Sequence, residues 1–150
     1  MIGIEDPRRD DVRRLLEQHR TFASGVMPPE GVHVLDPDAH DDTLTFFSLR
    51  VDGELLGIAA LRQLDPAHAE LKSMHTTAAA RGRGVGRALV DYLVAVAADR
   101  GVRRVSLECG SGPAFVPART LYASAGFVPC GPFGDYAATP DNVFMTRLLG

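Results

Sequence analysis

The residues best suited to chemistry lie between Arg81 and Arg87, where arginines and glycines alternate in the run RGRGVGR. An apolar segment with helical periodicity follows, so the run precedes a helix whose first N–H groups lack partners and carry partial positive charge. Glycines let a ligand come close to these amides, and arginine side chains suit phosphate oxygens. The run therefore predicts a phosphate-binding loop.

The spacing of the glycines excludes the two commonest nucleotide motifs. The sequence has no Gly-Lys-Ser/Thr ending of a Walker A loop, and G-x-G-x-x-G fails because Arg87 stands at the third glycine position. The remaining pattern is R-x-x-G-x-G, formed by Arg81, Gly84 and Gly86 between a strand and a helix.

Size and charge limit the classes of protein to be considered. The chain has 150 residues, of which 45% are hydrophobic and 23% charged, which predicts one domain over residues 1–150. A net charge of -3 provides no basic field for nucleic acid, so we expect no nucleic-acid partner. The early charges of MIGIEDPRRDD and the lack of a long apolar run predict a cytoplasmic protein without a membrane partner.

Cysteines and histidines indicate no metal site. Cys109 and Cys130 have no metal-ligand spacing and are typical of free thiols in a reducing compartment. His33, His40 and His68 also lack ligand spacing, so we expect no metal cofactor.

Periodicity predicts an α/β fold around the glycine loop. Before the loop we expect a strand at Ile2–Ile4, a helix from Val12, and an antiparallel meander with a hairpin turn at Asp52–Gly53 whose last strand covers residues 69–76. After it we expect helices from Val85 to Asp99 and over 115–125, and strands over 102–110, 127–130 and 142–148. The strand–helix–strand unit in the middle implies one parallel pair in a mostly antiparallel sheet. The Pro-, Gly- and Asp-rich segment from Ser24 to Asp42 is a candidate substrate loop with room for a short helix.

Two motifs resemble the GCN5-related N-acetyltransferase (GNAT) superfamily. The glycine loop is similar to its Q/R-x-x-G-x-G/A pyrophosphate loop for acetyl-CoA, and ARTLYASAGF, residues 118–127, is similar to its A-x-x-L-Y helix leading into G-F. The stretches ELKSM, CGPFGDY and NVFM also resemble a subgroup of small bacterial acetyltransferases. The resemblance implies the GNAT fold, in which the central parallel pair splays at the acetyl-CoA site between flanking helices.

The resemblance also implies the cofactor-binding residues. Main-chain groups of the strand ending in Met74, His75 and Thr76 would pair with the pantetheine arm of acetyl-CoA, the co-substrate. The His75 side chain would point away from Met74 and Thr76. The pyrophosphate would lie on the amides of Arg81, Gly82, Arg83, Gly84, Val85, Gly86 and Arg87, with Arg83 or Arg87 near the ribose phosphate. Phe115 stands where many relatives carry an asparagine that contacts the cofactor arm.

For catalysis, the resemblance implies that Tyr122 protonates the departing CoA thiolate. A primary amine is almost fully protonated at neutral pH, so a carboxylate or a water chain must take its proton. Glu70 matches the base of the histone-acetylating branch, and Glu108 on the next strand is the alternative. Asp135 and Tyr136 are candidates for shaping the acceptor pocket.

The expected function is transfer of an acetyl group from acetyl-CoA to a primary amine by direct attack in a ternary complex. The acidic run LDPDAHDD favours a cationic acceptor, and a homodimer is the expected form of any assembly. Two alternatives stay open: a non-catalytic acyl-CoA-binding or regulatory module, and an acyltransferase that uses another acyl-CoA.

Overall fold

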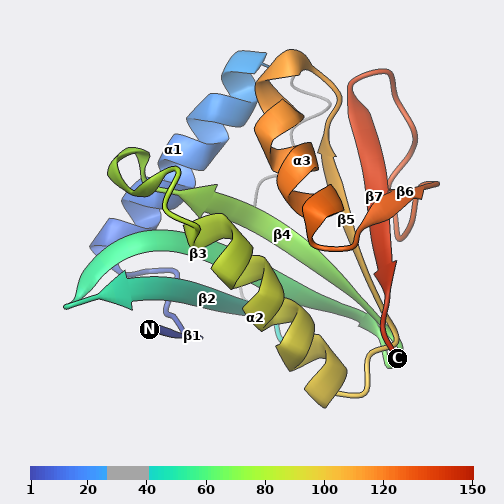
Figure 1. The fold of residues 1–150 in the computed structure, drawn as a ribbon, viewed down its shortest axis with the longest axis horizontal. Coiled ribbons are helices and arrows are strands. Elements are labelled where there is room, and N and C mark those ends of the chain that lie inside the picture. Colours follow the sequence, from blue (N-terminus) through green and yellow to red (C-terminus); the bar gives the residue numbers. More distant parts are fainter. Residues whose placement is uncertain (27–40) are drawn as a thin grey trace.

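The computed structural model describes residues 1–26 and 41–150, which form a seven-stranded sheet with helices on both faces (Figure 1). The elements are β1 (Ile2–Ile4), α1 (Asp10–Val26), β2 (Leu44–Val51), β3 (Glu54–Asp65), β4 (His68–Thr76), a 3-10 turn (Ala78–Ala80), α2 (Val85–Asp99), β5 (Arg104–Gly110), a second 3-10 turn (Pro113–Phe115), α3 (Val116–Ser124), β6 (Val128–Cys130) and β7 (Asn142–Leu148). The strand order is β1-β2-β3-β4-β5-β7-β6, and the β4–β5 pair is parallel between antiparallel neighbours.

This architecture confirms the expected α/β class and element order for the described residues. The β2–β3 turn lies at Asp52–Gly53, where both residues have the positive φ that such a two-residue turn requires. One boundary was wrong: α1 continues to Val26, so the segment predicted as a loop from Ser24 begins in a helix. The rest of that candidate substrate loop, with its short helix, His33 and His40, lies outside the described residues.

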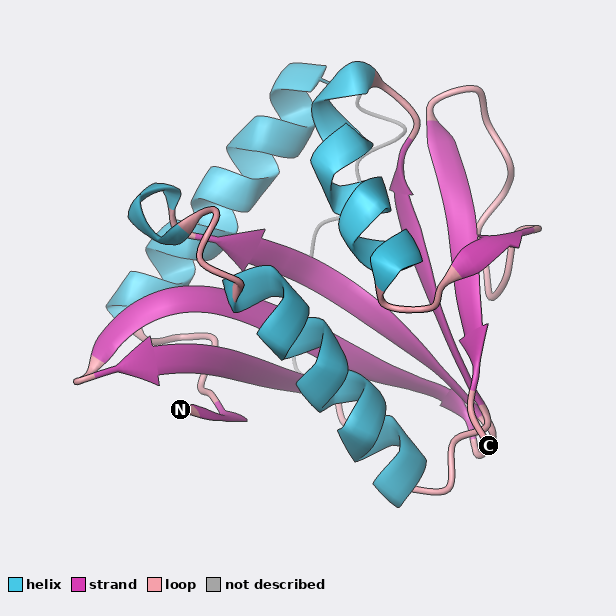
Figure 2. Ribbon diagram, viewed as in Figure 1, coloured by secondary structure: helices cyan, strands magenta, loops and turns pink. Residues whose placement is uncertain are grey.

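Helices lie on both faces of the sheet (Figure 2), and each face has its own apolar core. On one face, α1 buries Val12, Leu15 and Leu16 against β2 and β3. On the other, α2 and α3 cover the larger core, where Leu89 and Leu93 of α2 are fully buried. The helices keep their apolar residues at spacings of three and four, which places them on the face toward the sheet. No helix of the described residues is long and apolar enough to span a membrane.

The two central strands separate part of the way along. Pairing between β4 and β5 ends at Glu70 and Ser106, although β4 continues to Thr76 and β5 to Gly110. The sheet therefore opens into a wedge at the carboxyl ends of its only parallel pair among the described strands.

A bulge in β4 changes which side chains face which helix. Across β3, Lys72 pairs with Ala60 but His75 pairs with Ile58, so Ser73 and Met74 together oppose one residue, and Ser73 has a φ of +53°. Glu70, Lys72 and His75 consequently share the α1 face. Met74 packs on the α2 side.

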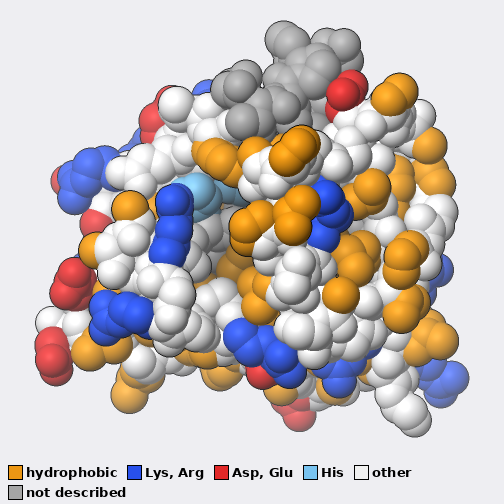
Figure 3. Space-filling view, turned by 45° about the horizontal axis from the view of Figure 1, so that its top comes forward, with side chains coloured by type: hydrophobic (Ala, Val, Ile, Leu, Met, Phe, Trp, Pro, Cys, Tyr) orange, Lys and Arg blue, Asp and Glu red, His pale blue; other side chains and the backbone are white. Residues whose placement is uncertain are grey.

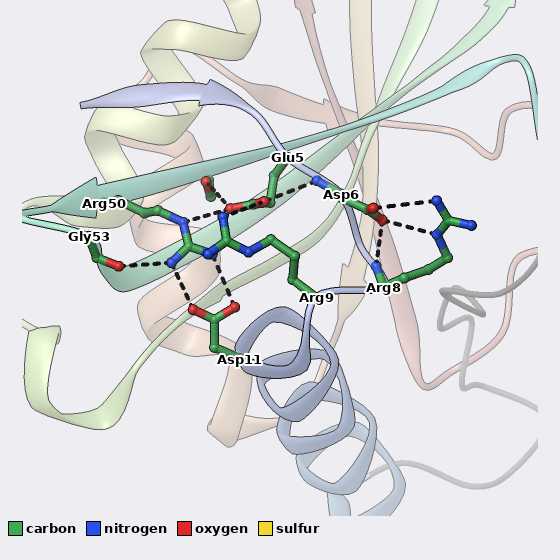
Figure 4. Close-up of polar contacts among 8 residues, drawn as sticks. Glu5, Asp6, Arg8, Arg9, Asp11, Arg50 and Gly53 are labelled. Carbon is green, nitrogen blue, oxygen red and sulfur yellow. Dashed lines mark hydrogen bonds and ion pairs between the residues drawn. The ribbon is translucent and has the colours of Figure 1, made fainter.

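A partly buried guanidinium ties the start of α1 to the sheet (Figure 4). Arg50 of β2 donates to Glu5 Oε1 at 2.7 Å, to both Asp11 oxygens at 2.7 and 3.0 Å, and to the Gly53 carbonyl at 3.0 Å. Ser48 also donates to Glu5. The Arg50 side chain is 15% exposed and that of Glu5 is 6% exposed. The network therefore connects β1, β2, the hairpin turn and α1.

Replacing Arg50 should destabilise the fold. Arg50→Met leaves a buried Glu5 carboxylate without its cation, so we expect the free energy of unfolding to fall by about 2–3 kcal/mol. Arg9→Ala is the matched control, because Arg9 approaches the same Glu5 at 3.7 Å but is 56% exposed, and it should cost less than about 1 kcal/mol. Urea unfolding of wild type, Arg50→Met and Arg9→Ala measures both losses of unfolding free energy. Equal losses in the two variants would contradict the special role given to Arg50.

The cost of Arg50→Met should also depend on pH. Burial opposes ionisation of Glu5, but the bonds from Arg50 and Ser48 outweigh it and lower its pKa from 4.5. The Arg50 hydrogen bond likewise lowers the pKa of Asp11 from 3.8. Stability from lowered carboxyl pKa values is present above the unfolded-state values and is lost as pH falls through the folded ones. The stability gap between wild type and Arg50→Met should therefore shrink from about pH 6 to about pH 3; a constant gap would contradict this.

Candidate active site

The wedge between β4 and β5 contains a cavity of about 620 Å³ that is lined from both faces of the sheet. Its walls include Glu70 and Lys72 from the α1 face and Leu121 and Tyr122 from α3. Figure 3 shows the hollow in the surface, with Lys and Arg side chains around it and a His side chain inside. Because the strands have separated, the cavity connects the two sides of the sheet.

Of the thirteen predicted site residues, twelve line this cavity: Glu70, Met74, His75, Thr76, Arg81, Gly82, Gly84, Val85, Gly86, Arg87, Glu108 and Tyr122. Arg83 is exposed and does not line it. Asp135 is also exposed and outside the lining, whereas Tyr136 lies within it.

The start of α2 is open to a ligand. Gly84 is the residue before the helix, with a left-handed φ of +81°, and no side chain caps the first N–H groups. Gly82 also has a positive φ, of +75°. Gly86 serves a different purpose, because a Cβ there would lie 3.0 Å from Leu121 of α3. The glycines thus set the loop conformation and the close approach of α2 to α3, leaving uncapped amides that suit an anion.

The arginines of this loop differ in their surroundings. Arg87 donates to Asp91 at 3.0 and 3.1 Å and to Ser124 of α3 at 3.3 Å, so it is held at the cavity wall between two helices. Arg81 lines the cavity, and its charge contributes to lowering the pKa of His75.

His75 points toward α1, as expected from its alternation with Met74 and Thr76. Its Nδ1 lies 3.1 Å from Nδ1 of His19. Burial lowers the pKa of His19, and burial together with His19 and Arg81 lowers the pKa of His75 to about 4. Both rings are therefore neutral at neutral pH, and one donates to the other.

The Tyr122 side chain is buried in the α2-side core and reaches the cavity. Its ring packs edge-on against Phe127, with centroids 6.1 Å apart. Among the described residues, no group is hydrogen-bonded to its hydroxyl. Burial, with a smaller contribution from Cys109, raises the pKa of Tyr122, so the phenol stays protonated and can donate to a ligand.

Cys109 also lines the cavity, and its surroundings make it a poor nucleophile. Burial raises the pKa of its thiol to about 11. Since the thiolate is the reactive form, a thiol that remains protonated at neutral pH does not attack a thioester readily.

A buried polar cluster forms the wall of the cavity on the α1 face. Lys72 Nζ donates to Glu70 Oε2 at 3.3 Å and to the Tyr136 hydroxyl at 2.6 Å, and that hydroxyl donates to the same Glu70 oxygen. Burial and the Glu70 charge raise the pKa of Tyr136. Glu108 accepts a bond from Asn142 at 3.2 Å. The two predicted carboxylates therefore line one cavity with Tyr122.

Sequence reasoning missed Lys72, although it stands two residues from Glu70 on one strand and so shares its face. It also missed the aromatic contact between Phe22 of α1 and Phe115, whose centroids are 5.3 Å apart across the cavity. The Phe115 ring lies where any Cβ on Gly110 would clash, at 2.1 Å. The expected Asn position therefore holds an apolar ring that links the α1 and α3 sides.

The cavity has groups suited to a phosphate-bearing co-substrate. The uncapped amides and Arg81 lie at one end, and the unpaired edge of β4 runs from there toward Glu70. Among the described residues, no group of three or more His, Cys, Asp or Glu side chains is arranged to hold a metal ion.

Comparisons with known proteins agree with this arrangement. The family model for the acetyltransferase (GNAT) family matches residues 12–127. The protein named uncharacterized N-acetyltransferase YsnE of Bacillus subtilis (strain 168) is 40% identical over 149 residues, which cover 99% of each chain. A crystal structure from Klebsiella pneumoniae matches with a TM-score of 0.84 at 22% identity, over 100% of this chain and 97% of that one.

A second solved structure, a Bacillus subtilis acetyltransferase in complex with CoA, matches with a TM-score of 0.71 at 15% identity, over 99% of this chain and 97% of that one. At these identities the two structures establish a shared fold. Together with the family model and the close relative, they show that the chain belongs to the GNAT family of acyl-CoA-dependent acetyltransferases.

Proposed function

We propose that the protein transfers an acetyl group from acetyl-CoA to a primary amine by direct attack within one ternary complex. One observation carries this proposal: a single cavity through the sheet joins the uncapped N-terminus of α2, the Tyr122 hydroxyl, and the carboxylates of Glu70 and Glu108. Phosphate, leaving group and amine would thus each meet a group of suitable chemistry in one enclosure, which favours reaction through positioning.

The chain's own groups would hold acetyl-CoA at three places. Amides of residues 82–87 would donate hydrogen bonds to the pyrophosphate, with Arg87 and Arg81 beside it. Main-chain groups of β4 beyond Glu70, which have no partner strand on the β5 side, would bond the pantetheine arm. Phe115 offers that arm an apolar surface in place of an amide.

Glu70 is the preferred acceptor of the amine proton. Its Oε2 is occupied by Lys72 and Tyr136, whereas Oε1 has no partner among the described residues. Oε1 would therefore be the oxygen that takes the proton. Glu108, which Asn142 orients, is the second candidate on the same wall.

The transfer itself would need no covalent enzyme intermediate. The neutral amine attacks the thioester carbonyl carbon and the new C–N bond forms. The C–S bond then breaks with its electron pair on sulfur, and the nitrogen releases its remaining extra proton to solvent. Tyr122 donates its hydroxyl hydrogen to that sulfur, and solvent restores the proton. The protonated state of Cys109 supports direct attack over transfer through a thiol.

Removing the Tyr122 hydroxyl should slow turnover without weakening cofactor binding. Tyr122→Phe retains the buried ring but removes the donor, so we expect kcat to fall about 100- to 1000-fold while the acetyl-CoA Kd changes less than about twofold. The measurements are CoA thiol release with an amine acceptor and calorimetric acetyl-CoA binding. Tyr92→Phe on the exposed side of α2 is the control and should behave as wild type. Equal losses of binding and turnover would contradict the role of Tyr122.

A side chain at Gly84 should block cofactor binding. Gly84 and Gly101 have φ values of +81° and +83°, with open space around each, at opposite ends of α2. Gly84→Leu and Gly101→Leu therefore carry a similar backbone cost of about 1–2 kcal/mol. Only Gly84→Leu should weaken acetyl-CoA binding, by about 100-fold or more, because it covers the amides. Calorimetry on the two folded variants measures this, and unchanged affinity in Gly84→Leu would refute the phosphate site.

A further inference from the structure

The cluster of Lys72, Glu70 and Tyr136 leaves one cationic donor unused. The Lys72 side chain is 7% exposed and that of Glu70 is 3% exposed, yet both residues line the cavity. An ammonium has three N–H donors, and the described residues accept from Lys72 only at Glu70 Oε2 and at the Tyr136 hydroxyl. A buried charge is stable when its hydrogen bonds are satisfied, so the third donor calls for an acceptor in the cavity.

Lys72 is also held firmly in position. Tyr136 comes from the segment between β6 and β7, 64 residues away, and its ring lies 5.3 Å from Lys72 Nζ, a cation–π distance. Phe133 packs edge-on against that ring at a centroid distance of 5.3 Å, and Phe144 packs against it in a tilted orientation at 5.9 Å. A lysine restrained in this way presents its remaining donor in a fixed direction, which suits recognition better than a mobile surface lysine.

Beside this cation lies an open anionic oxygen. Glu70 Oε1 has no partner among the described residues, and it belongs to the carboxylate that already bonds Lys72. Glu70 and Lys72 therefore present one negative and one positive position side by side on this wall, which Glu108 also lines. A purely cationic amine would satisfy the carboxylate but would face the Lys72 charge, whereas a ligand that carries both charges would satisfy both.

We propose that the acceptor is a zwitterionic amine, an α-amino acid or a close analogue, whose carboxylate binds Lys72 while its amine faces Glu70. In an α-amino acid one carbon separates the amine from the carboxylate. This short separation matches the adjacent positions of Glu70 and Lys72. The inference rests on the proposed function and narrows its acceptor class. It also makes Lys72 a specificity-determining residue of the cavity.

The test compares amino acids with their carboxamides. Thiol release from acetyl-CoA is measured with each of the 20 amino acids and its primary amide, and kcat/KM is obtained for any pair that reacts. Wild type should prefer the amino acid. In Lys72→Met this preference should fall about 10- to 100-fold, the value of a hydrogen bond between charged groups. Lys72→Arg should retain it within about threefold. An amino acid and its amide differ in the basicity of their amines. Because this difference is the same for every variant, comparing the acid-to-amide preference between variants removes its effect.

A structural role for Lys72 gives a different result. Loss of activity in Lys72→Met that is equal for the acid and the amide overturns the inference, provided that acetyl-CoA still binds. If Lys72→Met does not fold, the acid-to-amide preference of wild type and of Lys72→Arg decides. Wild type that releases thiol with polyamines, aminoglycosides or lysine peptides, but with no amino acid, overturns the inference and leaves the proposed function standing. Binding of acetyl-CoA with no release on any amine overturns both.

Discussion

The candidate active site depends on the point where β4 and β5 stop pairing. Beyond Glu70 and Ser106 the two strands diverge, and the sheet loses a row of hydrogen bonds that a continuous sheet would keep. The gap gives the cavity walls from both faces and leaves main-chain groups of β4 without a strand partner. The uncapped start of α2 lies at one end of the cavity, and the Glu70 carboxylate lies on its α1-side wall. An opening in the sheet thus places uncapped helix amides, a phenol and a carboxylate in one enclosure.

Burial keeps four of the groups around that gap in their neutral forms. The phenol of Tyr122, the thiol of Cys109 and the imidazoles of His19 and His75 are all shifted toward their neutral forms by desolvation. Glu70 instead has Lys72 beside it, and a paired charge tolerates burial. Neutral donors therefore surround the centre of the cavity, with cations at the α2 end and a matched ion pair on the α1 face.

Much of this arrangement could be predicted from local sequence. Glycines at 82, 84 and 86 predicted an open loop before a helix, and periodicity predicted the order of the strands and helices. The bulge at Ser73 could not be predicted, because a single residue with positive φ in a strand has no reliable local signal; strict alternation would place Glu70 and His75 on opposite faces. The Lys72–Tyr136 contact likewise joins distant segments, so only the fold reveals it.

The most direct test mixes the protein with acetyl-CoA, with and without an amine, and follows the acetyl group. Thiol release and the mass of the intact protein are measured together over a panel of amino acids, polyamines, aminoglycosides and lysine peptides. Direct transfer within one cavity predicts no thiol release without an amine, release equal to the acetylated amine formed when one is present, and no acetyl group on the protein. An acetylated protein formed before the amine is added, or binding without release for every amine, would contradict it.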